Sequence, residues 1–397
     1  MRRATAVIVL VALAGVSFAV GAKYATDDDG GGGGGADNVA KAPGSPATQT
    51  VKKSMWGNLT LDDGTPLFPV YRDLGVGLFS TAVRWDDVAP DERPKNPTDP
   101  SDPAYTWPSY LQVAIDEATK NNMEVQVLVL GTPKWANGGK DWPWVPNDPK
   151  DYGDFMQAIS RKYPSVGHWM IWGEPNREPN FKPLTPVEEG QETAPLNKAQ
   201  QVAPRNYAEL VDAAYEGIKS VEPDDNVIAG NTYTSAGVDD INPYQWIENL
   251  KLRDGSRPRM DMWGHNPFGF AKPDLDDPPS RKGVVAFADL RRLTAVLDEN
   301  FPGPPLKLFL AEWGVPEGFK DKDIGYVRSP EEADEWIRAG FKIANEWDRI
   351  YSLGWIHPVN TDRSSMGLLT VEGKKKPTYD SYKNSLYDGG KSAKKGR

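Results

Sequence analysis

Short apolar runs alternate along the chain with longer stretches in which apolar residues recur every three or four positions. The short runs are rich in β-branched and aromatic residues and predict β-strands. They cover residues 54–59, 77–84, 124–130, 168–172, 226–230, 261–265, 307–312 and 350–357. Two of them are apolar almost throughout, over 125–130 with Gln126 as the exception and over 308–310, which is typical of strands buried on both faces.

The longer stretches predict one amphipathic helix after each strand. Between residues 207 and 221 the apolar side chains recur at helical spacing, at Leu210, Val211, Ala214, Ile218 and Val221. The predicted helices cover residues 67–74, 108–121, 149–163, 203–221, 243–252, 287–299, 330–345 and 377–387. Eight strands alternating with eight helices predict a closed parallel (β/α)8 barrel, a TIM barrel, over residues 53–388. The competing open sheet needs a glycine-rich phosphate turn, and Gly75-Val76-Gly77 lacks its third glycine.

The N-terminus predicts export from the cytoplasm. Arg2 and Arg3 precede an apolar run over residues 4–22. As a helix this run would span roughly 28 Å, close to the hydrocarbon thickness of a bilayer. Small residues at 20–22 fit a cleaved signal peptide, while the length of the run fits an uncleaved membrane anchor. Either alternative places the rest of the chain outside the membrane, as a secreted protein or one tethered to its outer face.

Low-complexity segments flank the predicted barrel. Residues 23–52 contain an acidic triplet, a run of glycines and a Pro/Ser/Thr/Ala stretch, which together predict a flexible linker. Residues 389–397 are rich in Gly, Ser and Lys and predict a disordered basic tail.

Charge and composition narrow the classes of function. With 46 basic and 56 acidic residues the net charge is −10, which disfavours nucleic-acid partners but not neutral sugars. The chain has no cysteine, so disulfides, thiol nucleophiles and cysteine-ligated metals are excluded. No cofactor is expected, and the chain is expected to be a monomer.

Two glutamates directly follow apolar strands. Glu174 ends the run 169–174, Trp-Met-Ile-Trp-Gly-Glu, and Glu312 ends the run 308–312, Leu-Phe-Leu-Ala-Glu. Residues at the carboxyl ends of barrel strands line the active site. Cleavage of a glycosidic bond needs one carboxylic acid to protonate the leaving group and one carboxylate to attack the sugar. The pair therefore predicts a glycosidase.

These two strand ends resemble the fourth- and seventh-strand signatures of the large clan of retaining glycoside hydrolases built on (β/α)8 barrels, clan A. The resemblance covers about residues 54–388 and is nearest to the xylosidase-like and cellulase-like branches. It implies that Glu174 is the general acid/base and Glu312 the nucleophile.

Further positions are similar to the clan's sugar-binding residues. Arg84 resembles the arginine that keeps the nucleophile ionised, His265 the sixth-strand histidine, and Trp355 the tryptophan that floors the sugar subsite. The aromatic loop after the third strand adds Trp135, which we interpret as a sugar-stacking residue. Asn176 is a candidate ligand for the sugar 2-hydroxyl.

Two positions depart from the clan pattern. Gly173 replaces the asparagine that binds the sugar 2-hydroxyl, which leaves Asn176, Asn231 and Asn266 as candidates for that contact. Phe268 replaces the tyrosine that orients the nucleophile, and Tyr233 is the candidate substitute.

Two other functions compete with a retaining hydrolase. The departures at Gly173 and Phe268 are what a non-catalytic carbohydrate-binding barrel would show. A metal-dependent hydrolase would use His265, His357 and Asp362 as ligands.

Overall fold

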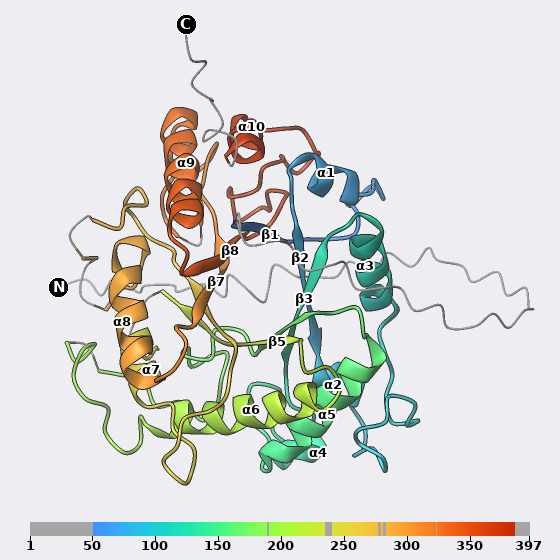
Figure 1. Cartoon of the computed structure of the whole chain (residues 1–397). Coiled ribbons are helices and arrows are strands. Elements are labelled where there is room, and N and C mark those ends of the chain that lie inside the picture. Colours follow the sequence, from blue (N-terminus) through green and yellow to red (C-terminus); the bar gives the residue numbers. More distant parts are fainter. Residues whose placement is uncertain are drawn as a thin grey trace, which may run out of the picture.

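Eight parallel strands form a closed barrel in the computed structural model, which describes residues 51–188, 190–234, 240–276, 279–280, 283–322 and 324–385. Each strand pairs with its neighbours in sequence, and β8 closes the barrel against β1. The helices lie around the strands (Figure 1). The predicted (β/α)8 architecture is therefore confirmed.

Every predicted strand overlaps an observed one. The strands are β1 Lys52–Trp56, β2 Leu78–Arg84, β3 Glu124–Leu130, β4 His168–Ile171, β5 Asn226–Tyr233, β6 Met262–Asn266, β7 Lys307–Trp313 and β8 Ile350–Trp355. The main differences lie at strand ends, where β5 continues to Tyr233 and β8 stops at Trp355. The barrel register shifts in β5–β6 and in β7–β8, so alternation along the sequence does not fix which way these ends face.

The helices also follow the predicted order. They are α1 Phe68–Asp73, α3 Ser109–Lys120, α5 Pro149–Lys162, α6 Val202–Lys219, α7 Pro243–Glu248, α8 Leu290–Asn300, α9 Pro330–Glu346 and α10 Pro377–Asn384, with a 3₁₀ turn η1 Phe287–Asp289 before α8. Two one-turn helices, α2 Trp85–Val88 and α4 Lys134–Asn137, were not predicted. They are too short to show helical periodicity, and they lie at the end of the barrel where β2 and β3 finish.

Strands buried on both faces account for the largely apolar runs. Residues 125–130 of β3 are all buried, between the barrel interior and the surrounding helices. Some helices approach each other closely. A Cβ added at Gly153 in α5 would lie 2.7 Å from the carbonyl oxygen of Ala213 in α6, so this crossing requires a glycine.

The N-terminal boundary of the barrel lies slightly earlier than predicted. Val51 is buried and β1 begins at Lys52, so both belong to the barrel rather than to the linker. The predicted signal or anchor, the rest of the linker and the basic tail lie outside the described residues. Within the described part of the chain, no helix is long and apolar enough to cross a membrane.

Candidate active site

The structure brings Glu174 and Glu312 to the same end of the barrel. Glu312 is the next-to-last residue of β7, and Glu174 follows the end of β4. The exposed fraction is only 1% for Glu174 and 4% for Glu312. Burial raises the pKa of Glu312 well above its usual value, the charge of Glu174 raises it further, and Arg177 lowers it. The two carboxyl groups therefore interact electrostatically in a site that is nearly closed to water.

The backbone that carries Glu174 is strained. Trp172 and Glu174 have φ angles of +64° and +44°, a region that non-glycine residues seldom adopt. Asn231 near the end of β5 is the same, with φ +44°. Such strain costs on the order of 1–3 kcal/mol per residue and tends to occur at functional sites. Here it sets the direction of the Glu174 side chain at the mouth of the barrel.

Three side chains donate hydrogen bonds to Glu174. Arg177 Nη1 lies 2.9 Å from Oε2, and Asn180 Nδ2 lies 3.5 Å from the same oxygen. Asn266 Nδ2, from the end of β6, lies 3.0 Å from Oε1. Both carboxyl oxygens of Glu174 are therefore held by donors from the protein.

Arg177 is held in place from several sides. Its side chain is 3% exposed and forms a second ion pair with Asp240, at 3.6 Å between Nε and Oδ1. The guanidinium also lies over the ring of Tyr233, 4.3 Å from the centroid. Sequence reasoning missed Arg177, although it lies three residues after Glu174 and faces it across one turn.

Glu312 lacks comparable support. Its Oε2 is buried and has no hydrogen-bond partner among the described residues. Phe268 is buried and packs against Tyr233, with ring centroids 6.3 Å apart. Tyr233 packs its ring on Arg177. Burial favours the neutral form of the Glu312 carboxyl group, and Arg177 offsets only part of the resulting rise in its pKa.

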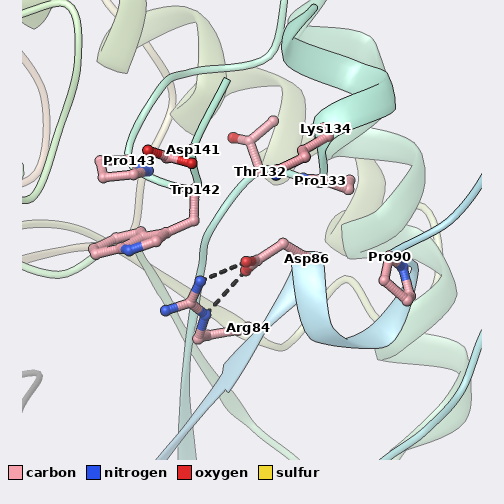
Figure 2. Close-up of a pocket in the computed structure, with 9 residues that line it drawn as sticks. All are labelled: Arg84, Asp86, Pro90, Thr132, Pro133, Lys134, Asp141, Trp142 and Pro143. Carbon is pink, nitrogen blue, oxygen red and sulfur yellow. Dashed lines mark hydrogen bonds and ion pairs between the residues drawn. The ribbon is translucent and has the colours of Figure 1, made fainter. Parts of the chain in front are cut away.

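Arg84 does not act on Glu312 as the resemblance implied. Its guanidinium pairs with Asp86, through Nε at 3.0 Å from Oδ1 and through Nη2 to Oδ2. The cation that lowers the pKa of Glu312 is Arg177 instead. Arg84 still lines a pocket at the barrel mouth (Figure 2), so a direct contact with substrate stays a prediction.

Asn176 and His265 are both engaged inside the protein. The Asn176 amide donates to the carbonyls of Tyr233 and Ile241 and accepts from the Tyr233 N–H at 2.8 Å. His265 is fully buried, with Nδ1 2.9 Å from Thr232 Oγ1 and Nε2 2.9 Å from the carbonyl oxygen of Val285. These contacts engage the amide of Asn176 and both ring nitrogens of His265 within the protein, and a contact of either residue with a sugar stays a prediction.

The two predicted tryptophans are packing residues in this structure. Trp135 is half-buried, donates to the carbonyl of Ala89 at 2.8 Å and packs edge-on against Trp85. Trp355 is 0% exposed and lies against Tyr382 of α10, with ring centroids 5.3 Å apart. Its ring therefore packs against the helix layer, and its predicted contact with a sugar stays a prediction.

The other asparagines keep more capacity for a ligand. Asn266 uses its amide nitrogen on Glu174, and its Oδ1 has no partner among the described residues. Both amide atoms of Asn231 are buried without a partner in the same part of the chain. These two, and not Asn176, are the better candidates for the contact that Gly173 cannot make.

The metal alternative lacks its ligand set. Within the described residues, no group of three or more His, Asp and Glu side chains is arranged to hold a metal ion. His265 has also committed both ring nitrogens to Thr232 and Val285.

Solved structures with the same architecture include several glycoside hydrolases. The glucosidase from Croceicoccus marinus superposes with a TM-score of 0.58 at 13% identity, covering 86% of this chain and 68% of that one. The monomeric β-xylosidase from Caulobacter crescentus gives 0.56 at 17% identity, covering 86% and 68%. This chain shares their fold. The family 39 glycoside hydrolase from Bacteroides cellulosilyticus gives 0.55 at 16% identity, and the match covers 84% of this chain and 63% of that one.

Neither a protein-family model nor a curated protein matches the sequence. The likeness therefore concerns the barrel, and any common chemistry has to be argued from the residues of this chain.

Proposed function

We propose that this protein is a retaining glycoside hydrolase that cleaves O-glycosidic bonds of an oligosaccharide or polysaccharide. The observation that carries the proposal is the buried pair of Glu174 and Glu312 at the ends of β4 and β7, which interact electrostatically. Structural neighbours described as a glucosidase and a β-xylosidase support the same class of reaction.

In the proposed mechanism Glu312 attacks the anomeric carbon while Glu174 protonates the glycosidic oxygen. The carbon–oxygen bond breaks, the leaving group departs as an alcohol, and a glycosyl ester forms on Glu312. Glu174, now a carboxylate, removes a proton from water. The resulting oxygen nucleophile displaces Glu312 and restores both groups with net retention at the anomeric carbon.

The substrate-free arrangement adds one requirement to this mechanism. Arg177 and Asn266 donate hydrogen bonds to Glu174, whereas burial raises the pKa of Glu312 and so favours its neutral form. The proposed roles therefore require the proton to pass from Glu312 to Glu174 as a sugar enters and the Arg177–Glu174 pair loosens. The same observation favours an exchange of roles, with Glu312 as acid and Glu174 as nucleophile, as the competing assignment.

Turnover of a broad panel of aryl glycosides and polysaccharides tests the proposal. The parent protein is compared with Glu174→Gln and Glu312→Gln, and with Glu299→Gln, an exposed position on α8, as the matched control. We expect the parent and the control to hydrolyse at least one substrate and the two site variants to lose at least about 10³-fold in kcat. A parent that binds sugars without hydrolysing any of them would be a carbohydrate-binding barrel.

The proposal places this activity outside the cytoplasm and assigns it to a monomer. The apolar run over residues 4–22 supports export. Cell fractionation of the full chain, with N-terminal sequencing of the mature protein, distinguishes a cleaved signal from an anchor, and light scattering measures the oligomeric state. A full-length chain in the cytosolic fraction contradicts the export.

A further inference from the structure

A polar pocket of about 460 Å³ lies at the carboxyl end of the barrel strands, between the loops that follow β2 and β3. Figure 2 shows Arg84, Asp86, Thr132, Asp141 and Trp142 around it. Its volume falls within the roughly 300–1,000 Å³ that is usual for small-molecule sites.

Thr132 contributes a buried hydroxyl group with nothing to bind. The residue is 1% exposed, and its Oγ1 has no hydrogen-bond partner among the described residues. Its backbone N–H donates to the carbonyl of Trp142 at 3.0 Å, which fixes it at the pocket wall. Because burying an unpaired hydroxyl costs free energy, a polar group that reaches this hydroxyl from the pocket would gain a hydrogen bond.

Arg84 is fixed with donor capacity to spare. Asp86 accepts from its Nε and Nη2, and no described group accepts from Nη1. The guanidinium lies over Trp142, 4.7 Å from the ring centroid. Asp86 thus holds the Arg84 guanidinium at its edge, and Trp142 covers one of its faces. Because the Arg84 side chain is already fixed, it loses little conformational entropy when a ligand binds.

The pocket is connected to the catalytic centre through stacked indoles. Trp142 stacks on Trp172, with centroids 6.5 Å apart and an interplanar angle of 27°. Trp172 lies two residues before Glu174 on the strained segment after β4. A sugar chain cleaved at the glutamates would therefore have this pocket beside it.

The charges of the pocket select the class of ligand. Arg84 and Lys134 supply two positive charges, and Asp86 and Asp141 supply two negative ones. A balanced set of donors and acceptors suits the hydroxyl groups of a neutral sugar and gives no net attraction to a phosphate or a uronic acid.

We propose that the pocket of Arg84, Asp86, Thr132 and Trp142 is a second sugar subsite. It binds a neutral sugar unit of the same chain, next to the unit whose glycosidic bond is cleaved. The inference rests on the proposed function, and it deepens it: the substrate is a neutral oligosaccharide or polysaccharide of at least two units, not a single-sugar glycoside.

The test compares kcat/KM for neutral oligosaccharides of two to six units from the series that the enzyme hydrolyses best. Thr132→Val removes the hydroxyl and keeps the shape, while Thr119→Val on the exposed face of α3 is the matched control. For Thr132→Val we expect the ratio of kcat/KM for the longest to the shortest substrate to fall roughly three- to tenfold, the worth of one hydrogen bond. The control is expected to keep the parental ratio. An unchanged ratio in Thr132→Val, or one that falls equally in the control, overturns the subsite.

A second variant tests whether the balanced charge of the pocket selects neutral sugars, and it leaves Thr132 unchanged. Asp86→Asn gives the pocket a net positive charge, so the preference for a neutral oligosaccharide over one with a terminal uronic acid should shrink at least about threefold. An unchanged preference overturns the choice of ligand class. If the parent hydrolyses no oligosaccharide of any length, the proposed function fails rather than the subsite alone.

Discussion

Arg177 Nη1 lies 2.9 Å from Glu174 Oε2, and both side chains are almost completely buried. The two carboxyl groups are supported unequally, because Arg177 pairs with Glu174 while Glu312 Oε2 has no hydrogen-bond partner among the described residues. The resemblance of the strand ends assigns the acid role to Glu174, whereas the raised pKa of Glu312 favours a proton on Glu312.

Removing Arg177 should have a large effect on both stability and pH dependence. In Arg177→Met two buried carboxylates lose their counter-ion, which typically costs roughly 3–5 kcal/mol of unfolding free energy. Because Arg177 lowers the pKa of Glu312, its loss raises that pKa and moves the pH profile of kcat/KM to higher pH. Chemical unfolding and a pH–rate profile measure the two effects.

The exposed pair of Lys182 and Glu178 provides the matched control. Their atoms are 3.0 Å apart, with side chains 31% and 36% exposed, so Lys182→Met should cost less than about 1 kcal/mol. Equal losses for the two variants would contradict a special role for the buried pair.

Glu312 should make the protein less stable as the pH rises. Its folded pKa is raised above the unfolded value, so its contribution is fully present below pH 4.5 and is lost as pH increases towards the raised pKa. Glu312→Gln cannot ionise, and we expect it to gain stability relative to the parent from pH 4.5 upward. Thermal unfolding of both proteins between pH 4 and 9 measures this, and parallel curves would show that Glu312 ionises freely.

His265 should have the opposite dependence. Burial lowers its pKa from 6.5 to about 4, so the neutral ring contributes stability above pH 6.5 that is lost as pH falls towards 4. Over that window the stability advantage of the parent over His265→Ala should shrink by about 3 kcal/mol. A variant with normal stability and a raised KM would instead restore the interpretation of His265 as a sugar ligand.

Substitutions of Trp355 in β8 distinguish a packing role from a sugar-binding role. Because its ring is buried against Tyr382, Trp355→Ala should destabilise the fold by roughly 3–5 kcal/mol. Trp355→Phe keeps most of the packing and should leave KM within about twofold of the parent. A KM raised tenfold in the stable Phe variant would place the ring at the substrate.

The sequence predicted the barrel well because apolar period and strand length are local properties. The buried run in β3 and the periodic helix α6 could be recognised without knowing what they pack against. The positions of Glu174 and Glu312 at strand ends could be predicted for the same reason, since each directly follows an apolar run.

The residues around the pair could not be predicted as reliably, since side-chain direction at a strand end depends on register. A register shift between Leu310 and Trp313 changes which side chains of β7 face inward, and no sequence pattern marks it. Arg84 donates to Asp86, two residues along the chain, which the predicted role at Glu312 did not take into account. Arg177 is the residue that a helical-turn spacing from Glu174 could have indicated.

Covalent trapping of the glycosyl-enzyme tests the central claim most directly. A 2-deoxy-2-fluoro glycosyl fluoride of the preferred sugar, incubated with the parent protein and followed by peptide mass spectrometry, identifies the nucleophile. We predict one glycosyl label per chain, on Glu312, and none in Glu312→Gln. A label on Glu174 would exchange the two roles. No label at all, in a protein that hydrolyses the corresponding glycoside without fluorine, would contradict the retaining mechanism.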